Sequence, residues 1–268
     1  MLVNGKAGNL ISIRDRGLLY GDGVFRTLRV EQGRPLHWPL HYQKIQHDCN
    51  ALGIECPDYA RLSDELGGLL ADYPDGVFKL IVTRGQATRG YAPASDAAAT
   101  HIWDVAPLPD YPESRALLGV TLRLCELRLA HQPRLAGIKH LNRLENVLAA
   151  AECAGADEGL LLDADENVIE GTRSNVFLVL GGRLATPDLA RCGVAGVARD
   201  RVMAYAGKIG MAVEVRAVKL DELRAADEVF LSNSVFGLWP VSRFGQRQWT
   251  DFDYALRIRA GLAGETNG

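Results

Sequence analysis

Apolar and polar residues alternate with two different periods along the chain, and these periods predict both helices and strands. A spacing of three and four predicts helices over residues 39–52 and 60–70, with Gly53 ending the first, and a further helix that starts near His140 and buries its leucines. One further helix is predicted to follow the glycine-rich residues 192–196 and to extend to Lys208, and another is predicted over residues 220–225. Alternation and short apolar runs predict strands over residues 76–83, 101–105, 120–125, 159–162, 168–171, 175–180, 183–185, 213–218 and 229–231. The pattern indicates a mixed α/β and α+β protein.

A proline-rich run divides this pattern into two parts. Residues 107–114 hold three prolines within six residues, which is typical of a linker between domains. We therefore predict an N-terminal α/β domain over residues 1–110 and a C-terminal domain over residues 111–268. The second domain combines a β-meander, or barrel-like sheet, with helices. A ligand is expected between the two, because clefts between domains commonly hold ligands.

Composition narrows the class of protein. The 268 residues are 47% hydrophobic and carry a formal net charge of −3, which favours a globular protein and gives no general attraction to nucleic acid. No apolar run is long enough to span a membrane, and the first residues lack the order of a secretory signal. Five cysteines without a Cys-x-x-Cys pair predict reduced thiols, so a cytoplasmic enzyme is the expectation.

Lys139 is the strongest candidate for chemistry. The chain has six lysines against twenty-four arginines, and Lys139 stands immediately before a predicted amphipathic helix. A lysine at such a position is usually just exposed to solvent. When it is desolvated, however, its amine loses a proton more easily and forms imines with carbonyl compounds.

Two further features predict an anion site and a carboxylate beside it. The glycine-rich residues 192–196 lead into a helix, whose free N–H groups and positive dipole attract anions. Residues 232–234 place small hydrogen-bonding side chains at the end of a strand, and Glu170 ends another strand. Pyridoxal phosphate uses a lysine for its aldehyde, an anion site for its phosphate and often a carboxylate for its ring nitrogen. Each feature alone is also compatible with an ordinary turn or helix start.

The glycine-rich loops add candidates for contacts with a ligand. Residues 14–23 bend the backbone where it comes close to a ligand or to another chain. Residues 84–91 place arginines and Tyr91 on one loop after a strand, which suits binding of carboxylates as well as simple exposure to solvent.

Taken together, four ordered segments resemble the class IV family of pyridoxal-phosphate enzymes. This family contains branched-chain aminotransferases, D-amino acid aminotransferases and aminodeoxychorismate lyases, and the resemblance covers nearly the whole chain. The segments are Lys139–Glu145, Glu170–Phe177, Gly193–Arg199 and Ala226–Ser234, with further similarity at residues 20–25 and 83–91. The chain is most similar to the lyases in the sequence of residues 139–145 and 232–241 and in its compact length.

The resemblance implies the two-domain fold of the D-amino acid aminotransferases and assigns a role to each candidate residue. Lys139 is the Schiff-base lysine, and Glu170 is the partner of the pyridine nitrogen. The substrate-binding residues are Thr27, which also lies near the cofactor, Arg89 and Tyr91. The residues expected around the cofactor phosphate are Lys44, Gly196, Val197, Asn233 and Ser234.

One position departs from the family pattern. The family usually shows His-x-x-Arg, and this chain has His41 followed three residues later by Lys44. Lysine keeps the charge and loses the bidentate fork of arginine.

The expected activity is elimination of pyruvate from aminodeoxychorismate to give para-aminobenzoate. The alternative is transamination of a branched-chain or D-amino acid, because both reactions share their first steps. A substrate with two carboxylates needs two cations, for which Arg84, Arg89 and Arg128 are candidates. The resemblance also implies a homodimer and a small-molecule substrate, and no nucleic acid or membrane partner is expected.

Overall fold

A computed structural model describes residues 1–86, 90–93 and 97–265 of the chain. They form two compact units. Among the described residues, the first contains those of Met1–Pro109 together with Ile138–Asn142, and the second contains Asp110–Gly137 and residues 143–265. The short segment Ile138–Asn142 therefore belongs with the first unit although the second unit surrounds it in sequence.

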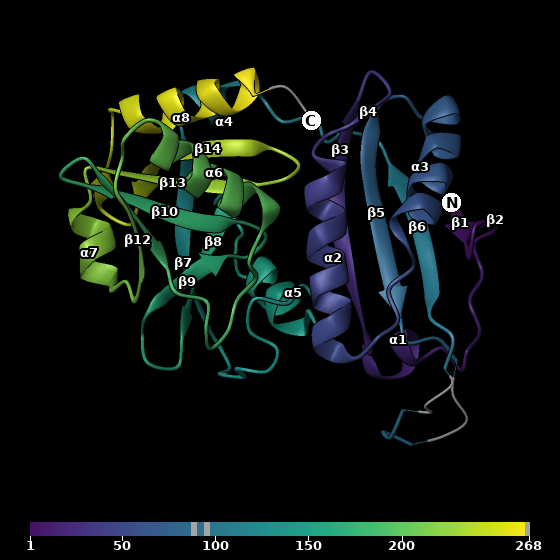
Figure 1. Ribbon diagram of the computed structural model, residues 1–268. Helices are drawn as coiled ribbons and strands as arrows, with labels where there is room; N and C mark the ends of the chain where they lie inside the picture. Colours follow the sequence, from purple (N-terminus) through teal and green to yellow (C-terminus); the bar gives the residue numbers. More distant parts are fainter. Residues whose placement is uncertain (87–89, 94–96, 266–268) are drawn as a thin grey trace. The chain divides into compact units, whose positions relative to one another are not determined.

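The first unit is a six-stranded sheet with its core on one face. The strand order is β2-β1-β6-β5-β3-β4. The long strand β5 pairs antiparallel with both of its neighbours, β3 and β6. Alternate residues of β3 and β5, such as Leu28 and Leu80, are fully buried against apolar residues of α2 and α3, so both helices cover the same face (Figure 1). The elements are β1 (Leu2–Val3), β2 (Lys6–Ala7), α1 (Arg16–Tyr20), β3 (Gly23–Glu31), β4 (Arg34–Pro35), α2 (Trp38–Leu52), α3 (Tyr59–Asp72), β5 (Gly76–Thr83) and β6 (Thr100–Ala106).

The glycine-rich segment before β3 packs against its own unit. A Cβ atom added to Gly17 would lie 2.3 Å from Thr83 Cγ2, and one added to Gly23 would lie 2.6 Å from the Val82 carbonyl oxygen. These glycines therefore allow close packing of α1 and β3 on the end of β5. For these two positions, the close approach predicted from the sequence is to the chain's own β5.

Asp22 fixes the end of this segment. Its carboxylate accepts hydrogen bonds from Arg16 Nε (2.7 Å) and Arg84 Nε (2.8 Å), and all three side chains are largely buried. Burial raises the pKa of Asp22, but the hydrogen bonds and charges of Arg84 and Arg16 outweigh it and hold the pKa below its ordinary value. The ionised form is thus the one that stabilises the fold.

Asp22→Asn is expected to lower the free energy of unfolding at neutral pH by about 2–4 kcal/mol, because two buried guanidinium groups lose their counter-charge. A carboxyl whose pKa is lowered by folding stabilises the protein above its unfolded pKa, and this stabilisation is lost as the pH falls through the folded pKa. The difference between the two proteins should therefore shrink below about pH 4. Urea unfolding of both proteins across pH 3–7 measures it, and a constant difference would contradict the assignment.

The second unit is built around a closed ring of strands. The order β10-β13-β14-β7-β8-β9 returns to its start because β9 also pairs with β10, and β11 and β12 extend the sheet beyond β10. The helices α6 and α8 pack on each other and on β13, and α8 also packs on β14 (Figure 1). The elements are α4 (Ser114–Leu117), β7 (Val120–Leu129), α5 (Leu144–Ala151), β8 (Glu158–Asp163), β9 (Val168–Gly171), β10 (Asn175–Leu180), β11 (Arg183–Pro187), α6 (Val197–Lys208), β12 (Val213–Arg216), α7 (Leu220–Ala225), β13 (Glu228–Asn233), β14 (Gly237–Phe244), β15 (Arg247–Gln248) and α8 (Asp253–Gly264).

The helix predicted to start near His140 begins later and is more exposed than expected. Helix α5 starts at Leu144, and Leu144, Val147 and Leu148 are 69%, 61% and 53% exposed. The residues before it cannot be helical because the backbone of Lys139 and Leu141 pairs with β3 instead. The prediction of a buried leucine face was therefore wrong, and Ala149 is the buried residue of this helix.

The remaining predicted elements are present, and some others were not predicted. The strand predicted over residues 213–218 ends at Arg216. Strand β14 was not predicted, and its Pro240 lacks the N–H group that a central strand normally uses. Helices α1 and α8 were also not predicted; in α8 only Ala255 and Ile258 are buried, so its apolar pattern is weak. Among the described residues, no helix has the length and apolar composition needed to cross a bilayer.

Candidate functional site

Lys139 lies on an extended segment that is hydrogen-bonded along β3. The amide N–H of Phe25 donates to the Lys139 carbonyl (2.9 Å), and the N–H of Leu141 donates to the Gly23 carbonyl (2.9 Å). Ile138, immediately before Lys139, is buried in the core of the first unit. The lysine is thus held at both sides by strand pairing, and its own side chain is half-buried.

A buried carboxylate accepts the backbone N–H of Lys139 itself. Asp48 Oδ2 accepts the Lys139 amide N–H (3.1 Å) and also forms an ion pair with Arg26 Nη2. Asp48 and Arg26 are 1% and 2% exposed. Asp48 was not predicted from the sequence, yet it stands four residues after Lys44 on a predicted helix, which places both residues on one face.

We expect Asp48 to position Lys139, so that stability and activity separate in its variants. Asp48→Ala should lower the free energy of unfolding by about 3–5 kcal/mol, because it removes one partner of a buried ion pair with Arg26. The double variant Arg26→Met, Asp48→Leu removes both charges and should recover most of that stability. Its kcat should stay about tenfold to a hundredfold low, because the Lys139 N–H still lacks an acceptor.

The conservative variant provides the control for this prediction. Asp48→Asn keeps an oxygen that accepts the Lys139 N–H, so its kcat should lie above that of the double variant. Urea unfolding measures stability, and steady-state kinetics measures kcat. If kcat follows stability through all three variants, Asp48 has a purely structural role.

The side chain of Lys139 shares an aromatic ring with a second lysine. Lys139 Nζ lies 4.6 Å and Lys79 Nζ lies 4.9 Å from the centre of the Phe25 ring. Thr27, two residues after Phe25 on β3 and opposite Lys79 on β5, lies on the same half-exposed face of the sheet. The first unit therefore brings Lys139, Phe25, Thr27 and Lys79 together, whereas Lys44 is half-buried on α2.

In the second unit, Glu170 lies where the ring of strands closes. Its pairing partner across β9 and β10 is Asn175, and Asn175 pairs in turn with Ser232 of β13. Glu170 is 4% exposed, and its Oε2 accepts the N–H of Val194 (2.8 Å). Asn175 holds the same loop, because its Nδ2 donates to the Val194 carbonyl (2.8 Å). The predicted carboxylate and the predicted glycine-rich loop are therefore in direct contact.

The loop ends at the N-terminus of helix α6, where its backbone is closely packed. The N–H of Gly196, the N-cap residue, donates to Asn175 Oδ1 (3.3 Å), and no side chain caps the helix. A Cβ atom at Gly196 would lie 2.5 Å from Asn175 Oδ1, so a larger residue does not fit without displacement. Val197, the first helical residue, is buried. This arrangement leaves the N–H groups of a twelve-residue helix available for an anion.

The three residues 232–234 at the end of β13 differ in what their side chains do. Ser232 is 1% exposed, and its Oγ has no hydrogen-bond partner among the described residues. Asn233 Oδ1 accepts the N–H groups of Val235 (2.9 Å) and Phe236 (2.8 Å), so this side chain mainly holds the turn. Ser234 is half-buried in that turn.

A second buried carboxylate shapes the turn that follows Glu170. Glu158, which is 1% exposed, accepts the N–H of Thr172 (3.1 Å) and the hydroxyl of Ser174 (3.1 Å). No local pattern indicates this role, because Glu158 lies on β8 and meets the turn through β8–β9 pairing. The carboxylate keeps Gly171–Ser174 compact beside the Glu170 position.

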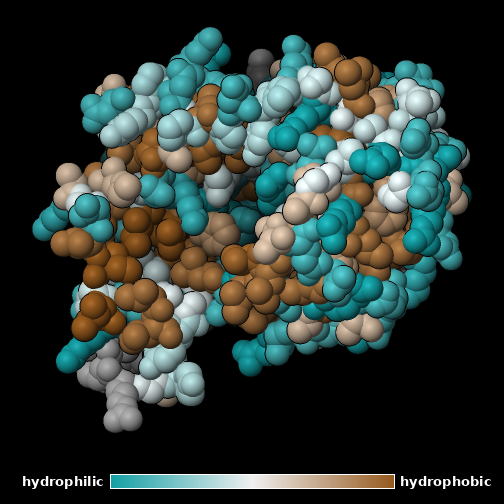
Figure 2. All heavy atoms as spheres, turned by 180° about the vertical axis from the view of Figure 1, so that it is seen from behind, coloured by the Kyte–Doolittle hydropathy of each residue, from teal (hydrophilic) through white to brown (hydrophobic). Residues whose placement is uncertain are grey.

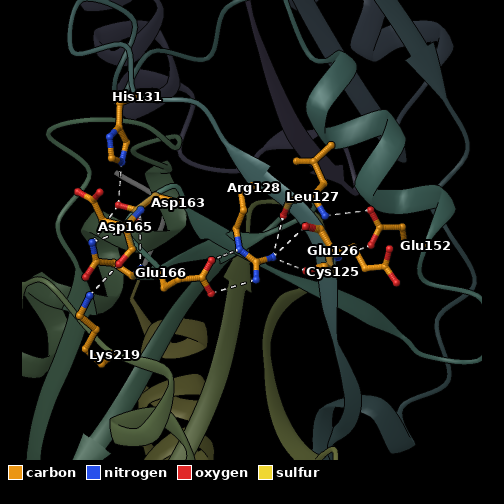
Figure 3. A network of polar contacts seen from close by, with 11 residues as sticks. Cys125, Glu126, Leu127, Arg128, His131, Glu152, Asp163, Asp165, Glu166 and Lys219 are labelled. Atoms are coloured by element: carbon orange, nitrogen blue, oxygen red, sulfur yellow. Dashed lines mark hydrogen bonds and ion pairs between the residues drawn. The ribbon is translucent and has the colours of Figure 1, made fainter.

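Two of the three arginines proposed to bind substrate carboxylates are already paired within the chain. Arg84 bonds Asp22 and the Leu52 carbonyl (2.7 Å). Arg128 donates to both carboxylate oxygens of Glu166, at 2.6 Å and 3.0 Å (Figure 3). Arg89 lies outside the described residues, and Tyr91 is 85% exposed with its ring 5.3 Å from that of Tyr20.

The second unit also holds a group of potential metal ligands with a structural explanation. His131, Asp163 and Cys192 place ligand atoms within 4.8 Å of one another. Asp163 accepts the N–H of Asn167 (2.8 Å) as well as His131 Nε2 (Figure 3). Burial raises the pKa of Asp163, but bonds from Asn167 and His131 outweigh it and lower the pKa. We interpret Asp163 as the carboxylate that closes the turn between β8 and β9.

The comparisons with known proteins indicate one and the same family. The model of the amino-transferase class IV family matches residues 23–244. An aminodeoxychorismate lyase of Vibrio harveyi is 36% identical over 243 residues, covering 90% of this chain and 89% of that protein. The crystal structure of 4-amino-4-deoxychorismate lyase from Pseudomonas aeruginosa is similar with a TM-score of 0.95 and 46% identity, covering 100% and 99% of the two chains.

An aminotransferase structure is also similar. The T.th. branched-chain amino acid aminotransferase, solved with pyridoxamine 5'-phosphate, has a TM-score of 0.84 and 25% identity, covering 97% of this chain and 90% of its own. The family match covers most of the chain, including the Lys139 segment, the Glu170 turn and the loop before α6. The chain therefore belongs to the amino-transferase class IV family.

Proposed function

We propose that this protein is an aminodeoxychorismate lyase, which eliminates pyruvate from 4-amino-4-deoxychorismate and yields para-aminobenzoate for folate synthesis. The similarity over nearly the full length to lyases from two organisms carries the proposal. The charge around Lys139 supports it, because the ammonium of Lys79 beside the same Phe25 ring favours an anionic substrate.

We propose pyridoxal 5'-phosphate as the cofactor, because the residues present suit each of its parts. Lys139 would bind its aldehyde, and the buried carboxylate of Glu170 would face its ring nitrogen. Two polar features suit its phosphate: the helix N-terminus at Gly196, which no side chain caps, and the buried Ser232 hydroxyl. The other residues that we assign to the phosphate are Lys44, Val197, Asn233 and Ser234.

Each residue would then contribute a distinct step. When bound, the cofactor supplies an electron sink for the bond that breaks at the substrate carbon. The Lys139 amine would remove the proton from the carbon that bears the substrate amine. Glu170 keeps a proton on the ring nitrogen. The C–O bond to the enolpyruvyl group would then break, the departing enolate would take up a proton and become pyruvate, and the ring would become aromatic without any added oxidant. Thr27, Arg89 and Tyr91 are assigned to substrate binding.

The alternative is an aminotransferase for branched-chain or D-amino acids, and the similarity to the T.th. aminotransferase is the observation that favours it. The two activities differ in their products. Incubation of the purified holoenzyme with aminodeoxychorismate should release para-aminobenzoate and pyruvate in equal amounts. Parallel incubations with branched-chain or D-amino acids and 2-oxoglutarate should form no glutamate. Glutamate formation without para-aminobenzoate would overturn the proposed function.

We further propose a homodimer in the cytoplasm. Hydrophobic side chains gather on parts of the surface (Figure 2), and in the first unit Leu10, Ile13 and Leu18 are 82%, 79% and 60% exposed. Exposed apolar residues in such numbers favour an interface with a second copy. All five cysteines are free thiols, which suits a reducing compartment. Sedimentation of the purified protein tests the dimer.

A further inference from the structure

The second unit contains a cleft that none of the proposed catalytic residues lines. It has a volume of about 630 Å³, which is within the usual range of about 300–1,000 Å³ for small-molecule sites. Its walls are the start of β7 (residues 121–124), the turn at residues 154–156, Arg224 of α7 and the β14–β15 hairpin (residues 243–247). All these residues belong to the second unit.

The charged residues that line this cleft are all positive. Four of its thirteen lining residues are arginines, none is acidic, and the protein as a whole carries a formal charge of −3. The arginines are Arg123, Arg224, Arg243 and Arg247. Surface arginines in a protein of this charge are normally interspersed with carboxylates, so four cations around one hollow favour an anion there.

Among the described residues, two of the four guanidinium groups have a hydrogen-bond or ion-pair partner, and two have none. Arg224 forms an ion pair with Asp221 (2.9 Å), and Arg247 donates to the Ala226 carbonyl (3.2 Å). Within the described part of the chain, the side chains of Arg123 and Arg243 form neither a hydrogen bond nor an ion pair. They stand on β7 and β14, which pair in parallel, with Arg243 opposite Thr121.

We propose that this cleft binds a small molecule with at least two oxyanion groups, either phosphates or carboxylates. Arg123 and Arg243 would bind these groups through bidentate hydrogen bonds, for which the planar guanidinium is suited. The half-buried Leu124 and the small residues Ala154, Gly155 and Ala156 complete the lining beside the arginines, and the volume of the cleft leaves room for the carbon skeleton that joins the two groups. The site is separate from the residues assigned to catalysis, so it does not depend on the proposed reaction.

Calorimetric titration of the full-length holoenzyme tests the proposal, with the cofactor in place so that its phosphate site is filled. The two probes are inorganic pyrophosphate and citrate, which separate phosphate from carboxylate recognition. We expect at least one of them to bind. Arg123→Gln with Arg243→Gln should weaken that binding about tenfold or more, because two charge-assisted contacts are lost. Both residues are exposed, so the double variant should fold normally.

The matched control is Arg134→Gln, which also removes an exposed arginine of the second unit and lies outside the cleft. Its affinity for the probe should equal that of the unchanged protein. Higher salt should weaken binding, because the interaction is electrostatic. The proposal is overturned if neither probe binds, or if the double variant binds as tightly as the control, which would place the probe elsewhere on the protein.

Discussion

Replacement of Lys139 by alanine is expected to lower kcat for pyruvate release by about 10⁴-fold, because the residue both anchors the cofactor and moves the substrate proton. The visible absorbance of the bound cofactor should shift to that of the free aldehyde. Borohydride reduction of the unchanged protein should attach the cofactor to the peptide that contains Lys139, and mass spectrometry of the digest identifies it. The fold should survive, because the backbone bonds of Lys139 to Phe25 and Asp48 do not involve its side chain.

Lys208→Ala is the control for this experiment. Lys208 is exposed on α6 and its side chain forms an ion pair with Glu265 (2.5 Å), so its loss should leave kcat unchanged. A label on any lysine other than Lys139, or full activity in Lys139→Ala, would remove the basis of the proposed mechanism.

Replacement of Glu170 by glutamine should give the second largest loss, with kcat falling about 10²–10³-fold while the cofactor stays bound. Glutamine keeps an oxygen that accepts the Val194 N–H, so the loop before α6 should stay in place. It carries no negative charge, and the proton on the cofactor ring nitrogen is no longer stabilised. Steady-state kinetics measures kcat, and absorbance of the purified variant measures cofactor content.

Glu228→Gln is a matched control for the loss of a buried carboxylate. Glu228 is 4% exposed and accepts the backbone N–H groups of Tyr254 and Ala255, both at 2.9 Å. Burial raises the pKa of Glu228 above its usual range, so its charge is already less favoured. This variant should keep its kcat. An equal fall in kcat for both variants would show that Glu170 acts through stability alone.

Much of the fold could be predicted from the sequence where a local rule applies. Helix α2 ends at Leu52, and the next residue, Gly53, has the positive φ of 64° that glycine adopts readily. Strand β5 spans Gly76–Thr83, as predicted from its apolar residues. The ordered motifs around Lys139, Glu170 and Gly196 also allowed the family to be predicted. These features depend on neighbouring residues, so a linear pattern contains them.

The tertiary structure decided what depends on residues far apart in the chain. Lys139 precedes an apolar spacing typical of a helix, but pairing with β3 extends its backbone, and Asp48, 91 residues away, accepts its N–H. Arg84 and Arg128 have the right chemistry for a carboxylate, and only the fold shows that Asp22 and Glu166 already occupy them. Which charges a protein uses internally depends on distances in space, and a one-dimensional pattern does not contain these distances.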